Sequence, residues 1–233
     1  MTAHAEGDPH NGRSALDAAE IMNVGANFLR EHVTDDVRIH YAFTEINTAA
    51  NVVHDKTTVL YYVRALSRET VEDVYNRLIK VAEDAAWMTE TEVDIEFLGG
   101  CYNTMQNKTL LDLIKDTMLK VPSISWTDEE LDFAKTLNEK SMTYEKMLSA
   151  RQITKDIQID DSMPDYDYIN MFGSNDVSEV QHIVPTVYFM TVGSNVGSGY
   201  HTWQVTSCAG HSIGMKGMIQ GAKIMSNAGI KAL

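Results

Sequence analysis

Four side chains occur at positions where they could take part in chemistry: His4, Asn51, Arg64 and His201. The guanidinium fork of an arginine matches a carboxylate bidentately, and an imidazole N–H can stabilise an oxyanion as it develops. His201 follows a Gly/Ser-rich loop over residues 193–199, from which a neutral imidazole can approach a zinc ion closely. Each residue, taken alone, also has a plainer interpretation. His4 could be a frayed terminal residue and Asn51 a turn residue. Arg64 could be a solvated charge at a strand end, and His201 an ordinary loop histidine.

Two amphipathic helices are predicted in the N-terminal part of the chain. Apolar side chains recur at helical spacing over residues 14–32 and again over residues 67–85, so one face of each segment is expected to be buried. Ser14 and Ser67 are expected to cap these helices, because a serine hydroxyl accepts a hydrogen bond from an amide of the first turn.

Strand-like segments surround these helices. Residues 37–43 and 57–63 have strand composition, and residues 91–97 alternate perfectly between polar and apolar side chains. With the extended segment that carries His4, the order is strand, helix, strand, strand, helix, strand, which is the split βαβ pattern. We therefore expect an α+β, ferredoxin-like unit over residues 1–105, with a complete and well-packed antiparallel sheet.

Residues 106–233 are expected to form a second region, with more helices and fewer strands than the first. Its expected elements are a helix over 107–120, a helix capped by Thr127, a long connection over 141–170, a strand over 186–190 and a last helix over 212–226.

Composition narrows the class of protein. The formal net charge of −14 argues against nucleic acid or an anionic membrane as a partner, since both require clustered cations. No apolar run approaches the length of a membrane span. Cys101 and Cys208 lie far apart without metal-type spacing, which indicates two reduced thiols in a cytoplasmic protein.

Several separated motifs resemble one known family. The chain has Ala-His-Ala at residues 3–5, followed by a proline and then by Asn-Gly-Arg-Ser-Ala-Leu-Asp-Ala at residues 11–18. This stretch resembles the start of the lid (peptidase dimerisation) domain of dinuclear-zinc amidohydrolases and aminoacylases, a metallopeptidase-like family. Within that family it is most similar to the p-aminobenzoyl-glutamate hydrolase type. Further matching segments are Asn-Val-Val at 51–53, Tyr-Tyr-Val-Arg at 61–64, Gly-Ser-Asn-Asp-Val at 173–177 and His-Thr-Trp-Gln-Val at 201–205.

The resemblance implies a role for each matching residue. His4 would polarise the scissile carbonyl oxygen, while Asn51 and Arg64 would hold the carboxylate of the substrate, all three reaching across a homodimer into the partner's active site. His201 would be the last ligand of the dinuclear metal centre. Asp176 would line the floor of the site and support it without binding metal. One departure from the family is His54, which stands where a proline usually follows Asn-Val-Val.

The resemblance also implies that most of the metal centre lies elsewhere. In the family the matching stretch lies mid-chain, after a half-domain that holds most ligands and the glutamate general base. Residues 106–233 are therefore expected to be the C-terminal, incomplete portion of an α/β zinc-hydrolase catalytic domain. No other histidine or acidic pair of this chain has suitable ligand spacing. We expect zinc or manganese in the intact family, and neither metal bound stoichiometrically by this truncated chain.

Two functions follow as expectations. The first is a metal-dependent amidohydrolase that cleaves an N-acyl or aminobenzoyl amide bond to an amino acid such as glutamate. Its chain would be inactive alone and completed by a separately encoded N-terminal half. The alternative is a non-enzymatic dimerisation or ligand-binding module. In either case, apolar faces of the second region, including Val187, Phe189 and the final helix, are expected to be exposed or covered by another chain.

Overall fold

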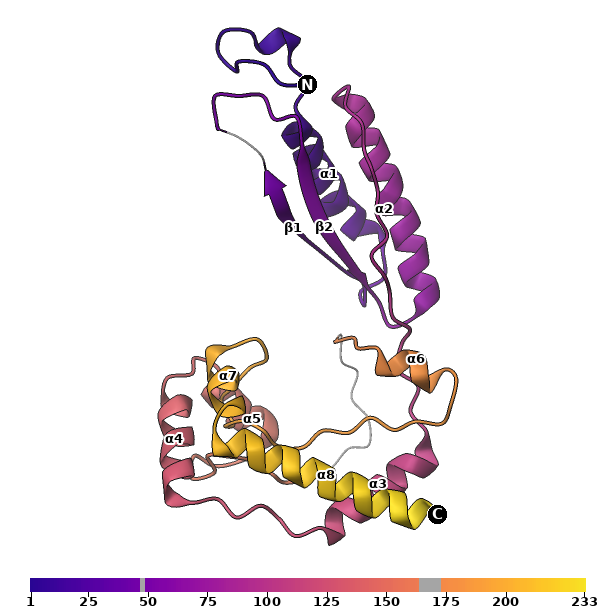
Figure 1. Cartoon of the computed structure of the whole chain (residues 1–233). Coiled ribbons are helices and arrows are strands. Elements are labelled where there is room, and N and C mark those ends of the chain that lie inside the picture. The colour runs from indigo at the N-terminus through magenta and orange to yellow at the C-terminus, as the bar shows by residue number, and fades with distance from the viewer. Residues whose placement is uncertain (47–48, 164–172) are drawn as a thin grey trace. The chain divides into compact units, whose positions relative to one another are not determined.

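The structure is a computed structural model that describes residues 1–46, 49–163 and 173–233 (Figure 1). The chain divides into two compact units. Unit 1 comprises Met1–Thr104 with Asn170–His182, and unit 2 comprises Met105–Ile169 with Ile183–Leu233. Residues 164–170 of the predicted long connection lie outside the described residues.

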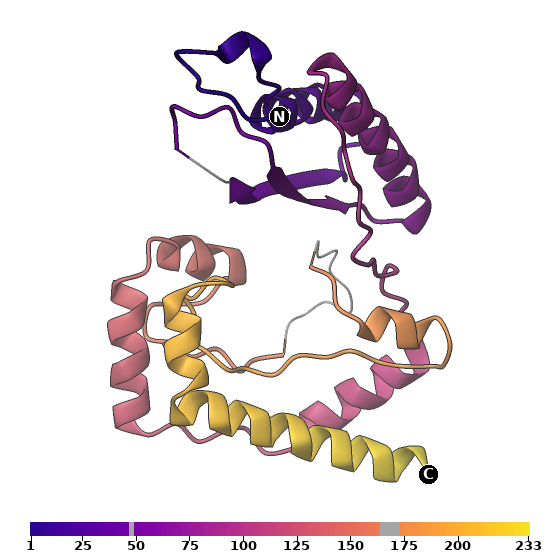
Figure 2. The same ribbon diagram turned by 45° about the horizontal axis from the view of Figure 1, so that its top comes forward.

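Unit 1 combines helices with a small antiparallel sheet, so the α+β class is confirmed. Its elements in chain order are η1 (Pro9–Asn11), α1 (Ala15–Leu29), η2 (Arg30–His32), β1 (Arg38–Ile46), β2 (Thr57–Arg64), α2 (Arg68–Met88) and α6 (Val177–Gln181). The two predicted caps form, because Ser14 accepts a hydrogen bond from the Asp17 amide and Ser67 accepts one from the Thr70 amide. Figure 2 shows α1 and α2 on the same face of the hairpin.

The β1–β2 hairpin supplies one wall of the core of unit 1. Its register pairs Arg38 with Arg64 at one end and Ile46 with Thr57 at the other. Ile39 of β1 and the half-buried Tyr61 and Val63 of β2 join this core. The buried residues of this core are Ala26, Leu29, Val37, Ile39, Val74 and Leu78.

The two outer strands predicted for this sheet, around His4 and over residues 91–97, are not formed. Among the described residues only β1 and β2 form the sheet, while His4 makes a single isolated bridge to Val52. Residues 91–97 form no strand and follow an irregular path, although their polar and apolar side chains alternate. Alternation determines which side chains share a face, but a strand also requires an adjacent strand edge with which to pair. The expectation of a complete sheet in unit 1 is therefore wrong.

Unit 2 is helical over its described residues. It contains α3 (Lys108–Lys120), α4 (Asp128–Glu139), α5 (Tyr144–Arg151), α7 (Trp203–Ala209) and α8 (Ser212–Ala232). Thr127 caps α4 in a reciprocal capping box with Glu130, as the sequence predicts. Helix α5 lies within the stretch predicted to be a long connection. Its hydroxyl and charged residues give it almost no apolar stripe, which is why periodicity does not reveal it.

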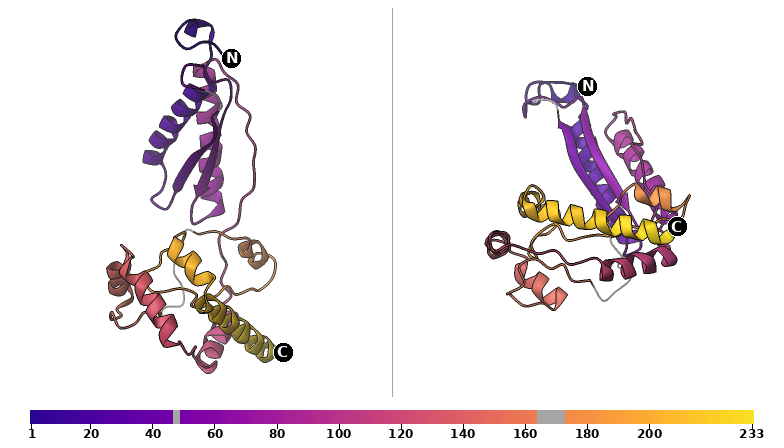
Figure 3. Two further views of the ribbon diagram at one scale, coloured as in Figure 1. Left: turned by 60° about the vertical axis from the view of Figure 1, so that its left-hand side comes forward. Right: turned by 60° about the horizontal axis from the view of Figure 1, so that its bottom comes forward.

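The strand predicted over residues 186–190 is also absent from the structure. Its side chains Val187 and Phe189 pack instead against the cluster that Ile114 of α3 forms with Ile224 and Ala228 of α8. These two side chains are half-buried within unit 2, so the expectation of full exposure is wrong, while cover by another chain stays a prediction. Helices α3 and α8 contact each other along this cluster (Figure 3).

Helix α8 is exposed on one side only, because Ile213, Ile224 and Ala228 are buried within unit 2. The large apolar side chains that α8 exposes are Met215, Met218, Ile219, Met225 and Ile230. No helix within the described ranges combines the length and the apolar character that crossing a membrane requires.

Candidate functional site

His4 and Asn51 are brought together by backbone pairing. The amide of Ala5 donates to the Asn51 carbonyl at 2.9 Å, and the amide of Val53 donates to the Ala3 carbonyl at 2.9 Å. These two bonds flank the His4–Val52 bridge. Two of the residues predicted to grip a substrate therefore lie on adjacent, antiparallel segments at one end of unit 1.

The His4 ring is held by the turn that follows it. Its Nδ1 accepts a hydrogen bond from the Gly7 amide at 3.0 Å and a longer one from the Glu6 amide at 3.3 Å. A ring nitrogen that accepts a hydrogen bond carries no proton, so the neutral ring bears its proton on Nε2. An imidazole fixed in this tautomer presents an N–H donor, which is the group required to stabilise an oxyanion.

The segment around His4 is tied to the first helix. The amide of Ala15 donates to the His54 carbonyl at 2.8 Å, at the position where the resembled family usually has proline. Gly12 approaches Val53 so closely that a Cβ at residue 12 would lie 2.8 Å from a methyl of Val53. A side chain at residue 12 would push the two segments apart, so glycine is required there.

Arg64 lies at the opposite end of the hairpin from this pair. It ends β2, whereas Asn51 precedes the first residue of that strand, Thr57. The eight residues of β2 span roughly 23 Å at a rise of about 3.3 Å per residue. Within one copy of the chain, Arg64 therefore lies far from His4 and Asn51. The family resemblance, in contrast, implies that all three residues contact the same substrate.

The Arg64 guanidinium instead meets the segment that carries Asp176. One of its Nη atoms donates to the Ser174 hydroxyl at 3.0 Å, and its centre lies 5.5 Å from the Tyr62 ring centroid. Asp176 is exposed and precedes α6 without a side-chain capping hydrogen bond. The structure thus brings Arg64 and the Gly-Ser-Asn-Asp segment together, a contact across more than a hundred residues that sequence spacing did not reveal.

His201 belongs to unit 2 and ends a tightly held loop. Its φ of 61° places it in the left-handed region, which is uncommon for a residue with a Cβ. The preceding loop is fixed by Asn138, a fully buried residue of α4. The Oδ1 atom of Asn138 accepts hydrogen bonds from the Asn195 side chain at 2.6 Å and from the Gly197 amide at 2.8 Å. This buried clamp was not apparent from the sequence, because Asn138 lies far from the loop in sequence and forms no recognisable motif.

A metal centre is not assembled by the residues that the structure describes. Among them, no group of three or more His, Cys, Asp or Glu side chains is placed to hold a metal ion. Zinc requires about three or four protein ligands, so His201 would need ligands from outside this set. Cys208 is buried, which raises the pKa of its thiol, and its sulfur donates to the Asn195 side chain at 3.5 Å.

Glu130 forms a second buried polar centre in unit 2. Its carboxylate accepts hydrogen bonds from Lys216 Nζ at 2.7 Å, from the Ser212 hydroxyl at 2.6 Å and from the Thr127 amide at 2.8 Å. Burial alone would raise the pKa of this carboxyl, but the three donors outweigh burial and lower the pKa to about 2. The sequence identified Glu130 as a capping residue only. Its partner Lys216 is brought to it because Ile213, at the start of α8, shares a buried cluster with Ala134 and Leu137 of α4.

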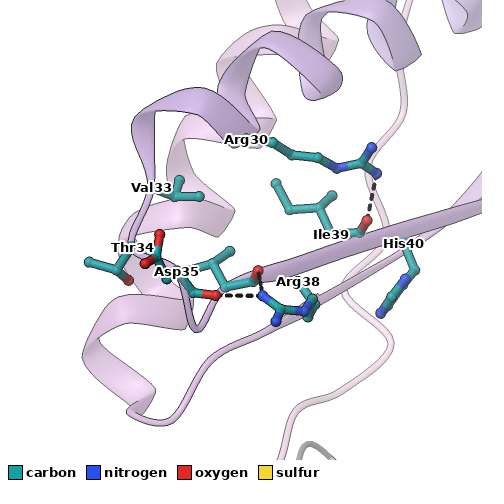
Figure 4. Close-up of a pocket in the computed structure, with 8 residues that line it drawn as sticks. Arg30, Val33, Thr34, Asp35, Arg38, Ile39 and His40 are labelled. Atoms are coloured by element: carbon teal, nitrogen blue, oxygen red, sulfur yellow. Dashed lines mark hydrogen bonds between the residues drawn. The ribbon is translucent and has the colours of Figure 1, made fainter.

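A shallow hollow of about 490 Å³ lies where α1 passes through η2 into β1 (Figure 4). Two arginines line it, but both are engaged by backbone carbonyls: Arg30 donates to Ile39 at 2.6 Å, and Arg38 donates to Asp35 at 2.6 Å. Because these guanidinium groups hold the chain turn in place, we assign the hollow a structural role.

Comparison with known proteins gives the following similarities. The chain is 33% identical over 243 residues to one of the subunits of the p-aminobenzoyl-glutamate hydrolase of Escherichia coli, an alignment that covers 97% of this chain and 50% of that protein. It is 33% identical over 113 residues to Xaa-Arg dipeptidase of Mus musculus, covering 46% of this chain and 25% of that protein. The chain thus spans half of the first relative and a quarter of the second.

Among solved structures, the chain is similar to an aminobenzoyl-glutamate utilization protein from Klebsiella pneumoniae. That similarity has a TM-score of 0.44 and 23% sequence identity, and it covers 54% of this chain and 32% of the other. No family model matches the sequence.

Proposed function

We propose that the chain forms part of a metal-dependent amidohydrolase. The proposal is supported by its homology, over nearly its whole length, to the Escherichia coli p-aminobenzoyl-glutamate hydrolase protein, which places it in the amidohydrolase family. The proposed reaction is hydrolysis of the amide bond between an N-acyl or aminobenzoyl group and an amino acid such as glutamate. The observation that carries this proposal is the His4 ring, held beside Asn51 in its Nε2–H tautomer by the Gly7 amide.

His4 acts in this proposal as the electrophile. Its Nε2–H donates to the scissile carbonyl oxygen and stabilises the negative charge that develops there as water attacks the carbonyl carbon. Asn51, on the adjacent segment, binds the carboxylate of the amino-acid part. Removal of a single oxyanion donor typically lowers kcat by about 10²–10³-fold, which sets the scale of the contribution expected from His4.

The distance between Arg64 and His4 makes the site dependent on a second copy. Residues at opposite ends of an eight-residue strand cannot grip one small N-acyl amino acid in the same copy. We therefore assign His4 and Asn51 from one copy, and Arg64 and Asp176 from the other, to each composite site. This arrangement requires a homodimer, which we propose forms through unit 1.

The metal, zinc or manganese, is proposed to be held chiefly by residues outside this chain, with His201 as one ligand. Because the described residues do not provide a ligand set, the roles assigned to this chain are to bind and orient the substrate. A separate N-terminal half would supply the remaining ligands and the general base. In this assembly residues 1–105 act as the lid (dimerisation) domain, and residues 106–233 form the C-terminal part of the catalytic domain. The two free cysteines fit a cytoplasmic enzyme.

The test is reconstitution of activity. The full chain is mixed with the half of the Escherichia coli relative that it does not cover, with added zinc or manganese, and release of glutamate from p-aminobenzoyl-glutamate is measured. We expect turnover only when both parts are present. His4→Ala should lower that turnover by about 10²-fold. His10→Ala, which alters an exposed histidine of the same segment, should leave turnover unchanged.

The alternative is a dimeric, non-enzymatic binding module, and it is favoured by the lack of a metal-ligand group among the described residues. It predicts that the chain alone binds p-aminobenzoyl-glutamate and that Arg64→Ala weakens this binding. It also predicts that no added half produces turnover. Calorimetric titration of the chain alone, beside the reconstitution assay, distinguishes the two functions.

A further inference from the structure

Two aromatic side chains of unit 2 are open to solvent on either side of His201 in the chain. The exposed fraction is 68% for Tyr200 and 55% for Trp203, although tryptophan is among the more buried residue types on average. His201 is exposed as well. Packing within unit 2 therefore does not account for either ring, and both ring faces are available to a ligand.

The backbone that carries these rings is firmly held. The loop before it is buried over residues 195–197, and Asn138 of α4 clamps that loop by hydrogen bonds. The Thr202 hydroxyl donates to the Gly199 carbonyl at 2.7 Å, which closes the turn that contains Tyr200. A ligand that binds rings on a fixed backbone has less chain to immobilise, so less of the binding free energy is lost to ordering.

The Tyr200 ring is also oriented by a contact from a distant segment. Its hydroxyl donates to the sulfur of Met190 at 3.5 Å, and the Met190 side chain is itself exposed. A thioether is polarisable and packs well against aromatic rings. Met190, Tyr200 and Trp203 are called the aromatic platform below. Their side chains suit a flat aromatic ligand, because such rings stack in offset or edge-to-face arrangements.

The chemistry of the proposed substrate indicates which group this platform would hold. In an aminobenzoyl amide, the aromatic ring is bonded directly to the carbonyl carbon that water attacks. A residue at the reacting carbonyl therefore lies close to the ring. The proposed function places His201 at the reacting centre, and Tyr200 and Trp203 lie within two residues of it.

We propose that the aromatic platform is the subsite for the acyl group of the substrate, and that it makes the protein select N-aroyl over N-alkanoyl amino acids. Trp203 and Tyr200 stack on the acyl ring, and Met190 supports Tyr200. An aromatic pair adds roughly 2–12-fold to an affinity beyond the apolar area that it buries. The inference rests on the proposed function, because that function places His201 at the reacting centre, but binding of the ring can be measured without turnover.

The first test divides the substrate into two probes and titrates each into the full chain by NMR. p-Aminobenzoate carries the ring without the amino acid, whereas N-acetylglutamate carries the amino acid without the ring. We expect p-aminobenzoate to shift the Trp203 indole N–H signal with a Kd on the order of 1 mM, and N-acetylglutamate to leave it unmoved.

Variants of the platform give the matched comparison. Trp203→Ala should weaken the binding of p-aminobenzoate about tenfold, and Trp203→Phe, which keeps a ring, should retain most of it. Trp87→Ala removes a tryptophan that is 82% exposed on α2 of unit 1, and it should leave the affinity unchanged. An unmoved Trp203 signal, or equal effects of the alanine variants at Trp203 and Trp87, would overturn the subsite.

The second test measures selectivity in the reconstituted assembly. Trp203→Ala should lower kcat/KM about tenfold for p-aminobenzoyl-glutamate, mainly through KM, and leave kcat/KM for N-acetylglutamate within about twofold. An equal loss on both substrates would overturn the proposal and assign Trp203 a structural role. Loss of p-aminobenzoate binding when the N-terminal half is added would also overturn it, because that half would then cover the platform. Absence of turnover with ring binding intact would instead refute the proposed function and support the subsite.

Discussion

The backbone amide of Gly7 donates a hydrogen bond of 3.0 Å to Nδ1 of His4. The two residues are three positions apart along the chain, and the turn between them closes through a second bond from the Asp8 amide to the His4 carbonyl at 2.9 Å. The turn therefore fixes both the orientation of the ring and the position of its proton.

The neutral form of His4 should carry its proton on Nε2. Long-range ¹⁵N–¹H correlation spectra distinguish a protonated from an unprotonated ring nitrogen, and Nδ1 should give the shift of an unprotonated acceptor. His10 provides an internal comparison because Nε2 of that ring lies 3.4 Å from the Asp8 carboxylate. A predominantly Nδ1–H tautomer at His4 would contradict both the geometry and the proposed electrophile.

The stability of unit 2 should fall as the solution is acidified through the pKa of Glu130. The folded pKa of about 2 lies below the ordinary value of 4.5, so ionised Glu130 stabilises the fold above pH 4.5. This contribution should be lost progressively between about pH 4.5 and pH 2, and its full size is on the order of 3 kcal/mol. Denaturant unfolding from pH 7 to pH 3 measures the loss, and Glu130→Gln should flatten the pH dependence.

The ion pair between Glu130 and Lys216 can also be tested by changing Lys216. Lys216→Met leaves a carboxylate buried without its charged donor, which should lower the free energy of unfolding by about 3 kcal/mol at pH 7. Lys223→Met provides the matched control, since Lys223 is exposed on the same helix. Equal effects of the two substitutions would refute a stabilising role for the Glu130–Lys216 pair.

Two glycines of α8 should respond oppositely to alanine. A Cβ at Gly217 would lie 1.9 Å from the Val192 carbonyl oxygen, whereas one at Gly221 would make only ordinary contacts near 3.6 Å with Thr191. Gly217→Ala should therefore destabilise the fold by about 2 kcal/mol or more through overpacking. Gly221→Ala should stabilise it by about 0.5–1 kcal/mol, because alanine favours helix. Chemical denaturation of both variants gives the comparison.

Asn138 should control the loop that precedes His201. Asn138→Ala removes the acceptor for Asn195 and Gly197 and leaves their buried donors unsatisfied, so unfolding should become easier by about 2–4 kcal/mol. Amide exchange over residues 193–199 should speed up beyond that global effect. Asn227→Ala alters an exposed asparagine that bonds only within α8, at the Lys223 carbonyl, and should change neither quantity. Unchanged exchange in the loop would show that Asn138 is not its clamp.

The local elements could be predicted from the sequence because their signals are local. Ser14, Ser67 and Thr127 cap helices whose apolar stripes follow directly, and each cap depends only on the next three residues. The hairpin also follows from composition, since β1 and β2 are neighbours in the chain and can pair without a third partner. The motifs of residues 3–18, 51–53 and 201–205 carried the family resemblance.

The tertiary structure decided everything that depends on a partner distant in the chain. Residues 91–97 and 186–190 are not strands, because pairing requires a free edge and neither alternation nor strand composition can show whether one is adjacent. The separation of Arg64 from His4 follows from the length of β2, which local patterns define but do not place in space. The buried contacts of Asn138 and of Glu130 join residues more than fifty positions apart. Their energies arise from burial, and burial is a property of the packed chain alone.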